Sequence, residues 1–273
     1  MYLPFSSAQR TTDVTRAKIY IGTSGGMYKS WAETFYPHDC VAKRHLEYYA
    51  TRFPTVEINA TFYRLPEEST FEGWCKKAPE GFLYAVKGSR AVTHLKRLKP
   101  GARSFKLLLD RSRRLRDHLG PYLWQLPPNF SKNAERLSAF LKALPRRLDH
   151  AVEFRHTSWF DPEISALLKR QKVAMVAVSS RKMPMHWEVT CDFVYIRFQG
   201  LKGGPAHNYT DRELEPWAEH LGCCARQGIK GFVYFNNDVN TRAPVNALRL
   251  MEMVGKYAVK VEARAQPSGL TVG

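Results

Sequence analysis

Eight short apolar runs divide this chain of 273 residues, and they constrain its fold more than any other feature. Longer stretches with helical or loop character separate the runs. Strands that alternate with helices are typical of α/β proteins, and eight such units predict a single (β/α)8 barrel of the TIM type. The runs cover residues 18–25, 55–63, 82–90, 122–128, 150–156, 173–180, 193–200 and 231–238.

The length of the chain fits one barrel domain, which we expect at residues 18–257. A flexible N-terminal arm is expected at 1–17 and a frayed C-terminal tail at 258–273. The intervening helices are expected at 41–52, 70–77, 104–116, 132–143, 162–170, 211–227 and 241–257. Ser131 is the expected N-cap of the helix at 132–143. No clear helix is expected at 181–188.

The cellular compartment is indicated by what the sequence lacks. No run of 18 apolar residues occurs, and the N-terminus does not have the order of a secretory signal, so no membrane association is expected. The five cysteines form no CxxC pair, which favours reduced thiols in a cytoplasmic protein and argues against a zinc cluster.

The charge is strongly basic, with 42 Lys and Arg against 25 Asp and Glu, a formal net charge of +17. Eleven of the basic residues lie between Lys87 and Arg116, where Asp110 is the one acidic residue. Such a concentration favours an anionic partner, either a small molecule or a nucleic acid bound weakly and in a salt-dependent manner. A solvated surface without a partner is the alternative.

Alternation along the runs places one polar set inside the barrel. Successive strand residues point to opposite faces, and the outer face must be apolar because it packs against helices. The polar alternates therefore point inward and converge at the C-terminal mouth, where TIM-barrel sites lie. This inward set is Glu57, Asn59, Lys87, Gln125, Glu153, Arg155, Arg197, Gln199, Asn236 and Asp238.

This polar set predicts a ligand or catalytic site, with a salt-bridged plug that merely closes the barrel as the alternative. The residues expected to act in catalysis are Glu57, Asn59, Lys87, Glu153, Arg155 and Asp238. The residues expected to bind ligand are Tyr28, Tyr63, Arg90, His94, Gln125, His156, Trp159, Arg197, Gln199, Lys202, Asn236 and Asn237. For the two histidines a structural role is the competing interpretation, and for the aromatic residues a lid over the core.

The chemistry of these residues limits the catalytic roles and cofactors that we expect. Cations near Glu57 and Glu153 keep both carboxylates ionised, which favours basic or electrostatic roles. The same carboxylates are expected to raise the pKa of Lys87, which argues against a Schiff base. The surplus of cations argues against a resident metal, and the absence of a Walker or GxGxxG sequence leaves no support for a nucleotide cofactor. The loop at 200–204, with Lys202, is a weak candidate for phosphate binding.

Several motifs resemble the YecE-like family, domain of unknown function 72. They are GTSG at 22–25, TVEINATFYRLP at 55–66, AVKGSRAVTH at 85–94, LWQLPP at 123–128, AVEFRHTSW at 151–159, DFVYIRFQG at 192–200 and FNND at 235–238. The resemblance covers about residues 18–256 and implies a TIM-type barrel without a settled activity or cofactor. Gln199 stands where the family often has His, and Ser179-Ser180 where an acidic residue is common, which lowers the expectation of a metal there.

Two classes of function remain. One is an enzyme, a hydrolase that is nuclease-like or directed to phosphate esters, that acts on a phosphorylated or nucleic-acid substrate at the mouth. The other is a non-catalytic protein that binds nucleic acid or an anionic metabolite. Buried carboxylates beside the ligand favour the enzyme, because anion binding alone has no use for them.

Overall fold

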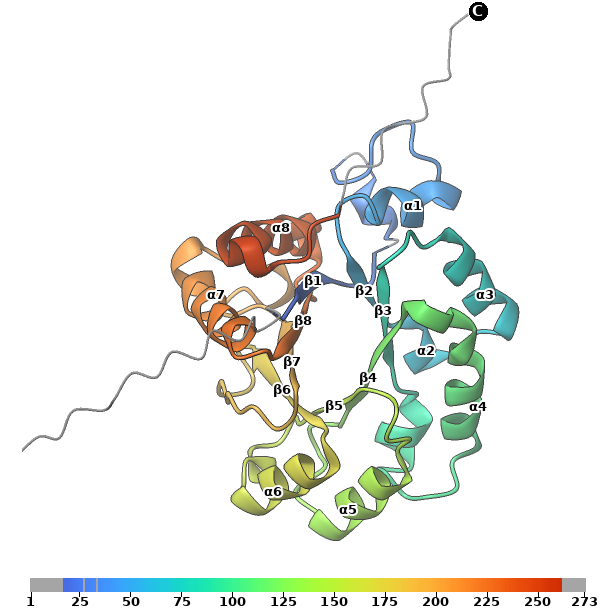
Figure 1. The fold of residues 1–273 in the computed structure, drawn as a ribbon, viewed down its shortest axis with the longest axis vertical. Coiled ribbons are helices and arrows are strands. Elements are labelled where there is room, and N and C mark those ends of the chain that lie inside the picture. The colour runs from blue at the N-terminus through green and yellow to red at the C-terminus, as the bar shows by residue number, and fades with distance from the viewer. Residues whose placement is uncertain (1–16, 27, 33, 262–273) are drawn as a thin grey trace, which may run out of the picture.

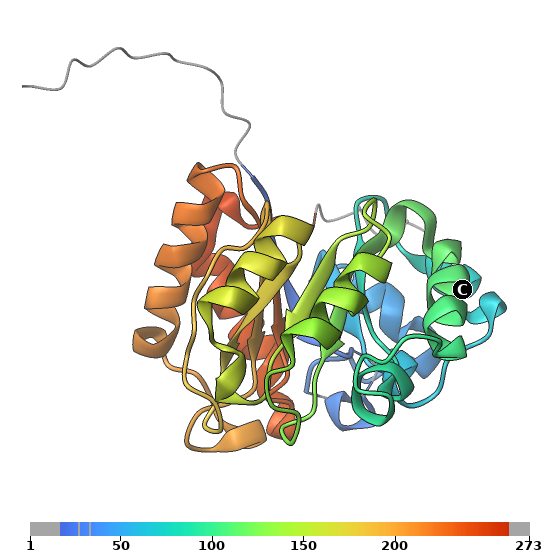
Figure 2. The same ribbon diagram turned by 90° about the horizontal axis from the view of Figure 1, so that it is seen from below.

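The computed structural model describes residues 17–261 except 27 and 33, and it has the predicted architecture of one closed parallel barrel (Figure 1). Each strand pairs with the next along the chain, and β8 pairs with β1 to close the barrel. The strands are β1 (Ile19–Ser24), β2 (Thr55–Ile58), β3 (Leu83–Lys87), β4 (Leu119–Gln125), β5 (His150–Glu153), β6 (Ala174–Ser179), β7 (Phe193–Phe198) and β8 (Lys230–Phe235). In Figure 2 the loops that follow the strands, which form the mouth, lie along the lower edge.

Helices surround the strands as an outer ring (Figure 1). They are α1 (His45–Tyr49), α2 (Ala60–Tyr63), α3 (Glu68–Lys77), α4 (Arg103–Ser112), α5 (Ala134–Ala143), α6 (Pro162–Gln171), α7 (Asp211–Arg226) and α8 (Arg242–Val254). No helix forms between β6 and β7, as expected for 181–188. The Asp161 side chain accepts a hydrogen bond from the N–H of Glu163, which caps α6 at its expected start.

Two local expectations were wrong. Strand β2 ends at Ile58 rather than continuing to Tyr63, because Asn59 has helical dihedral angles and α2 begins at Ala60. The cap of α5 is Asn133, not Ser131: the Asn133 Oδ1 accepts from the N–H of Arg136 at 2.8 Å. The basic stretch after β3 contains a π-helix, η3 (Ala91–Leu95), which is a rare conformation that often occurs at functional sites.

Two apolar layers confirm the alternation rule. Val56, Ile196 and Val233 belong to the large core between the strands and the helices. A smaller core fills the barrel itself, and it contains Ala85, Leu123, Ala151, Val176, Tyr195 and Tyr234. The barrel is therefore closed below its mouth by packed side chains, so it has no continuous pore.

The first residues of the expected tail lie against the barrel. Ala258 forms an isolated bridge with Ile19, and the N–H of Val259 donates to the Ile19 carbonyl at 2.9 Å. At the other end, the N–H of Ala17 donates to the carbonyl of Ala225. The remainder of the expected arm and tail lies outside the described residues.

Candidate functional site

A buried ion network occupies the centre of the barrel mouth. Glu57 from β2, Glu153 from β5 and Arg197 from β7 are almost completely buried, with exposed fractions of 0%, 0% and 1%. The guanidinium of Arg197 donates to both oxygens of Glu57, at 3.0 and 2.7 Å, and to Oε2 of Glu153 at 2.7 Å. One arginine therefore joins the two carboxylates that the sequence predicted to converge.

The remaining hydrogen-bonding capacity of the two carboxylates is also filled. Glu57 accepts from the hydroxyl of Ser24 and, at 2.7 Å, from the hydroxyl of Tyr195. The other oxygen of Glu153, Oε1, accepts from the amides of Gln125 and Gln199, each at 3.0 Å, and contacts the guanidinium of Arg155. Neither carboxylate is free to attack a substrate or to transfer a proton while these bonds persist.

Electrostatics agree with this pairing. Burial alone would raise the pKa of Glu153, but Arg155 and Arg197 lower it to about 2. Burial alone would lower the pKa of Arg197, but Glu57 and Glu153 raise it well above its ordinary value. Glu153 and Arg197 are thus both charged at neutral pH.

Lys87, at the end of β3, differs from the network although it lies beside it. Its Nζ lies 4.5 Å from the centre of the Phe62 ring and makes no hydrogen bond or ion pair with the residues that the structure describes. Burial and Arg197 lower its pKa to about 8, and the opposing effects of Glu57 and Glu153 are smaller. The net shift is opposite to the expected one, because burial and Arg197 outweigh the two carboxylates, although each carboxylate does favour the protonated amine.

One polar atom at the mouth has no hydrogen-bond partner among the described residues. It is Oδ1 of Asn59, whose Nδ2 donates to Ser24 Oγ at 2.9 Å. Buried polar groups are nearly always hydrogen-bonded, so this atom favours a ligand or ordered water here. Tyr28 lies alongside: its hydroxyl donates to the Ser24 carbonyl, and its pKa is raised to about 12, chiefly by burial.

The residues after β8 divide between the mouth and the scaffold. Asp238 accepts from the Trp31 indole, and burial raises its pKa. Asn236 is partly exposed, and its N–H donates to the Phe198 carbonyl. Asn237 is fully buried and donates to Asn246 and to the backbone of His207, so its side chain holds loops together rather than facing the mouth.

The aromatic and histidine residues predicted to bind ligand have different environments. Trp159 is completely buried, stacks on Phe154 and donates to the Phe130 carbonyl, as a core residue does. His156 caps the short helix that follows it by accepting from the N–H of Ser158. Tyr63, in contrast, is 79% exposed, and Lys202 is also exposed.

A basic groove lies beside the mouth on the side of β3 and β4. Its volume is about 570 Å³, and it is lined by His94, Leu95, Lys96, Arg97, Lys99 and Arg136. None of its four Lys and Arg side chains forms an ion pair within the part of the chain that the structure describes. Both Arg97 and Arg136 lie over the Phe130 ring, at 5.9 and 5.7 Å, which holds the two guanidinium groups near each other.

The groove is connected to Lys87 through one aromatic ring. The His94 ring packs edge-on against Phe62 at 5.0 Å, and Lys87 lies over the same ring. Burial, Lys87 and Arg90 lower the pKa of His94, which favours its neutral form. The basic groove and Lys87 are therefore neighbours, separated by the Phe62 ring.

Three cations further along the basic stretch are neutralised. Arg111 pairs with Glu67, Arg113 with Asp110, and Arg114 with Glu68 and Glu72. Glu67, Glu68 and Glu72 belong to or flank α3, which contacts α4 and the turn after it. Acidic residues distant in sequence thus oppose Arg111 and Arg114, whereas Arg103, Lys106 and Arg116 form no ion pair with the described residues.

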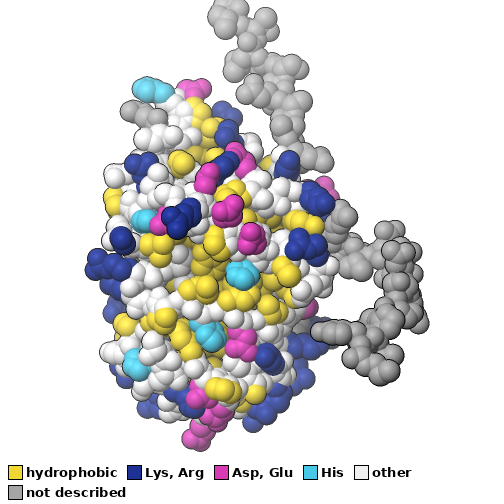
Figure 3. All heavy atoms as spheres, turned by 90° about the vertical axis from the view of Figure 1, so that its left-hand side faces the viewer, with side chains coloured by type: hydrophobic (Ala, Val, Ile, Leu, Met, Phe, Trp, Pro, Cys, Tyr) yellow, Lys and Arg dark blue, Asp and Glu magenta, His cyan; other side chains and the backbone are white. Residues whose placement is uncertain are grey.

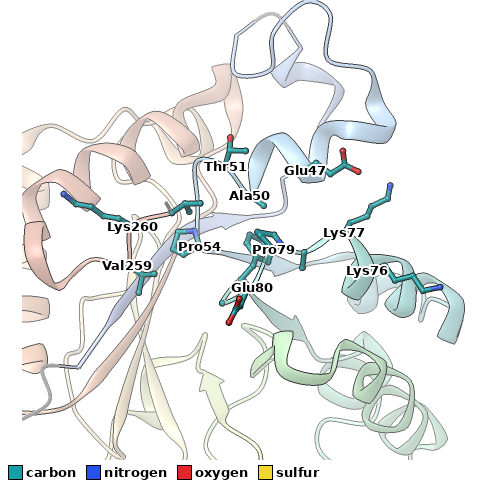
Figure 4. A pocket seen from close by; sticks show the side chains of 14 residues that line it. Glu47, Ala50, Thr51, Pro54, Lys76, Lys77, Pro79, Glu80, Val259 and Lys260 are labelled. Atoms are coloured by element: carbon teal, nitrogen blue, oxygen red, sulfur yellow. The ribbon is translucent and has the colours of Figure 1, made fainter. Parts of the chain in front are cut away.

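Charges are mixed elsewhere. On the face shown in Figure 3, acidic and basic side chains are interspersed among hydrophobic ones. A cavity of about 730 Å³ is at the opposite end of the barrel from the mouth (Figure 4). Pro54, Pro79 and Val259 line it together with lysines and glutamates. None of the predicted site residues lines this cavity.

Several residues of the site were not predicted. Ser24 ends the first apolar run, and Tyr195 was on the inward face, so the alternation rule could have included both. Phe62 is a different case, because it belongs to a short helix and not to a strand. Arg136 had no local signal at all, since its position in the groove depends on how α5 packs beside η3.

Two kinds of feature are absent from the described ranges, 17–261 without 27 and 33. No group of three or more His, Cys, Asp or Glu side chains there could hold a metal ion. No helix there is long and apolar enough to cross a membrane.

The fold and the polar mouth define a TIM-type barrel protein with a charged centre at the C-terminal ends of its strands. The chain belongs to the family described as "Protein of unknown function DUF72", whose model matches residues 20–270. This agrees with the resemblance that the sequence motifs indicated.

Relatives and solved structures support the assignment. The UPF0759 protein YunF of Bacillus subtilis is 26% identical and covers 86% of this chain and 94% of its own length. YecE of Escherichia coli is 28% identical over 62% of this chain and 61% of its own. A DUF72 protein of Thermotoga maritima superposes with a TM-score of 0.75 at 27% identity, covering 88% of this chain and all of that one. One from Enterococcus faecalis, at 19% identity, shares the fold with the same TM-score.

Proposed function

We propose that this protein is an enzyme that acts on a phosphorylated or nucleic-acid substrate at the C-terminal mouth of its barrel. The observation that carries this proposal is the basic groove, because four cations without acidic partners line one concavity that leads to Lys87. Cations that lack partners are available to bind phosphate oxygens. The partner-free atom Asn59 Oδ1 supports a ligand in the mouth itself.

The ion network supports an enzyme through its field rather than through direct chemistry. Glu57, Glu153 and Arg197 hold a fixed arrangement of charges below the mouth, and preorganised charges of this kind stabilise charge that develops in a transition state. The alternative is a protein that binds nucleic acid or an anionic metabolite without turnover. The groove suits that alternative equally well, so conversion of substrate distinguishes the two.

The five cysteines are free thiols, which is consistent with a cytoplasmic location.

Two triple variants of equal charge change test where the anion binds. Lys96→Gln/Lys99→Gln/Arg136→Gln removes cations of the basic groove, and Arg111→Gln/Arg113→Gln/Arg114→Gln removes cations that are paired with glutamates or aspartate. We expect the first variant to weaken binding of a labelled single-stranded oligonucleotide and of inorganic pyrophosphate. It should also lower the slope of log affinity against log salt for the oligonucleotide by about 2, since each lost phosphate contact contributes about 0.7.

The matched variant should bind almost as the native protein does. Fluorescence anisotropy over a salt series and isothermal titration provide the two measurements. Equal losses in both variants would place binding outside the groove and contradict the proposal. Binding without shortening of the oligonucleotide or change in a panel of phosphorylated compounds would favour the non-catalytic alternative.

A further inference from the structure

Lys87 has an amine that the rest of the site leaves unused. The two buried carboxylates are matched by two arginines, and every carboxylate oxygen already accepts from or contacts at least one donor. Lys87 is therefore the surplus cation at the mouth. It is only partly buried, so its Nζ remains accessible from the solvent side.

The charged groups around this amine come from four elements. Arg197 of β7 and Arg155 after β5 disfavour its protonated form, whereas Glu57 of β2 and Glu153 of β5 favour it. His94 of η3 lies across the Phe62 ring and is itself held toward its neutral form by Lys87. Burial and Arg197 prevail, and the pKa of Lys87 is about 8. A neutral lysine amine is a nucleophile, whereas an ammonium is not.

We propose that Nζ of Lys87 forms an imine with the carbonyl carbon of a short phosphorylated aldehyde or ketone whose phosphate lies in the basic groove. The phosphate part of this inference rests on the proposed function, and the carbonyl part adds the reacting group. The Nζ lone pair attacks the carbonyl carbon, a C–N bond forms, and the carbonyl oxygen gains a proton. The nitrogen loses its two protons in turn, the oxygen takes up a second proton, and the C–O bond breaks to release water as the C=N bond forms.

The positions of the basic groove and of Lys87 favour a short compound over a polymer as the substrate. The groove is on the rim, where Lys96 and Lys99 are exposed, but Lys87 is on a strand inside the mouth. A nucleic-acid backbone can follow the rim, yet its sugar would have to leave that path to meet the amine. A sugar phosphate of a few carbons joins the two sites directly, because His94 of the groove and Lys87 contact the same ring.

Borohydride trapping tests the inference. The native protein is incubated with glyceraldehyde 3-phosphate or with unphosphorylated glyceraldehyde, sodium borohydride reduces any imine to a stable secondary amine, and peptide mass spectrometry locates the modified lysines. We expect modification at Lys87 in preference to the other lysines, and at lower concentrations of the phosphorylated probe. Labelling should increase as pH rises through about 8, whereas an ordinary lysine, with a pKa of about 10.4, requires a higher pH.

Variants separate the carbonyl part from the phosphate part. Lys87→Met should abolish the selective modification, with a thermal melt to confirm folding. Lys96→Gln/Lys99→Gln/Arg136→Gln should reduce the preference for the phosphorylated probe on the order of tenfold or more, while glyceraldehyde in excess still labels Lys87.

Three outcomes would overturn this inference. Modification spread evenly over the lysines of the native protein would show that Lys87 is not a special nucleophile, and this result does not depend on any variant. Trapping of an oligonucleotide with an aldehydic abasic site in place of the small probe would replace the short compound with nucleic acid. Groove-dependent anion binding without any trapping would refute the amine while leaving the proposed function intact.

Discussion

Replacing Arg197 with Met should lower the free energy of unfolding by about 3–5 kcal/mol, because it leaves two buried carboxylates without their shared cation. Glu57 and Glu153 are both fully buried and both accept hydrogen bonds from this guanidinium. Met fills a similar volume, so most of the loss comes from uncompensated charge rather than from a cavity. Urea denaturation of both proteins at pH 7 measures the difference.

Arg249→Met is the matched control. Arg249 also pairs with two carboxylates, those of Asp211 and Glu252, but its side chain is 46% exposed. Pairs in that setting contribute about 0–1 kcal/mol, so this variant should be close to the native protein in stability. Similar losses in the two variants would mean that burial does not strengthen the network. If Arg197→Met does not fold, Arg197→Lys keeps the charge but not the bidentate geometry, and we expect it to be destabilised less.

The fold was predictable because strand spacing and alternation are local properties of the sequence. Eight runs gave the barrel, and the parity of Glu57, Glu153 and Arg197 within their runs placed all three inside it. Where local geometry changed, the prediction was wrong. The apolar run at 55–63 has the pattern of a strand through Tyr63. Asn59 instead has helical dihedral angles, and α2 begins at the next residue. The Thr61 hydroxyl then donates to the Lys87 carbonyl at the end of β3.

The sequence predicted which residues lie at the mouth but not which of them form ion pairs. Alternation along a strand indicates the face to which a side chain points, and it carries no information on its partner. The sequence therefore could not show that Arg197 joins both carboxylates and leaves Lys87 unpaired, and the resulting prediction for the pKa of Lys87 had the wrong direction. The same limitation affected the basic stretch: Arg111 and Arg114 are opposed by Glu67 and Glu68, which only the packing of α3 against its neighbours brings close.

The ion pairs also determine which residues of the mouth are structural and which are available to a ligand. A salt-bridged plug and a functional site were alternatives for the whole inward set. The structure favours a division between the two: Glu57, Glu153 and Arg197 have the contacts of a plug, whereas Lys87 and Asn59 retain unused bonding capacity beside it. A substitution at Glu153 should therefore lower the stability of the fold, whereas a substitution at Lys87 should affect the reaction with a ligand.

Glu153→Gln should therefore cost stability, on the order of 3–5 kcal/mol at pH 7, because Arg155 and Arg197 lose the charge that compensates them. The pH dependence identifies the cause. The folded pKa of Glu153 is about 2, below its ordinary value of 4.5, so its contribution is fully present above pH 4.5 and is lost as pH falls toward 2.

The two proteins should consequently converge in stability as the solution is acidified. Each pH unit within that window removes up to about 1.4 kcal/mol from the native protein that the variant does not lose, since Gln has no proton to gain. Other carboxylates with lowered pKa values, such as Asp161 and Glu188, are present in both proteins and cancel in the difference. Urea denaturation at intervals between pH 6 and pH 3 measures the difference in unfolding free energy between the two proteins. A stability difference that stays constant over this range would show that Glu153 stabilises the barrel by its shape and hydrogen bonds rather than by its charge.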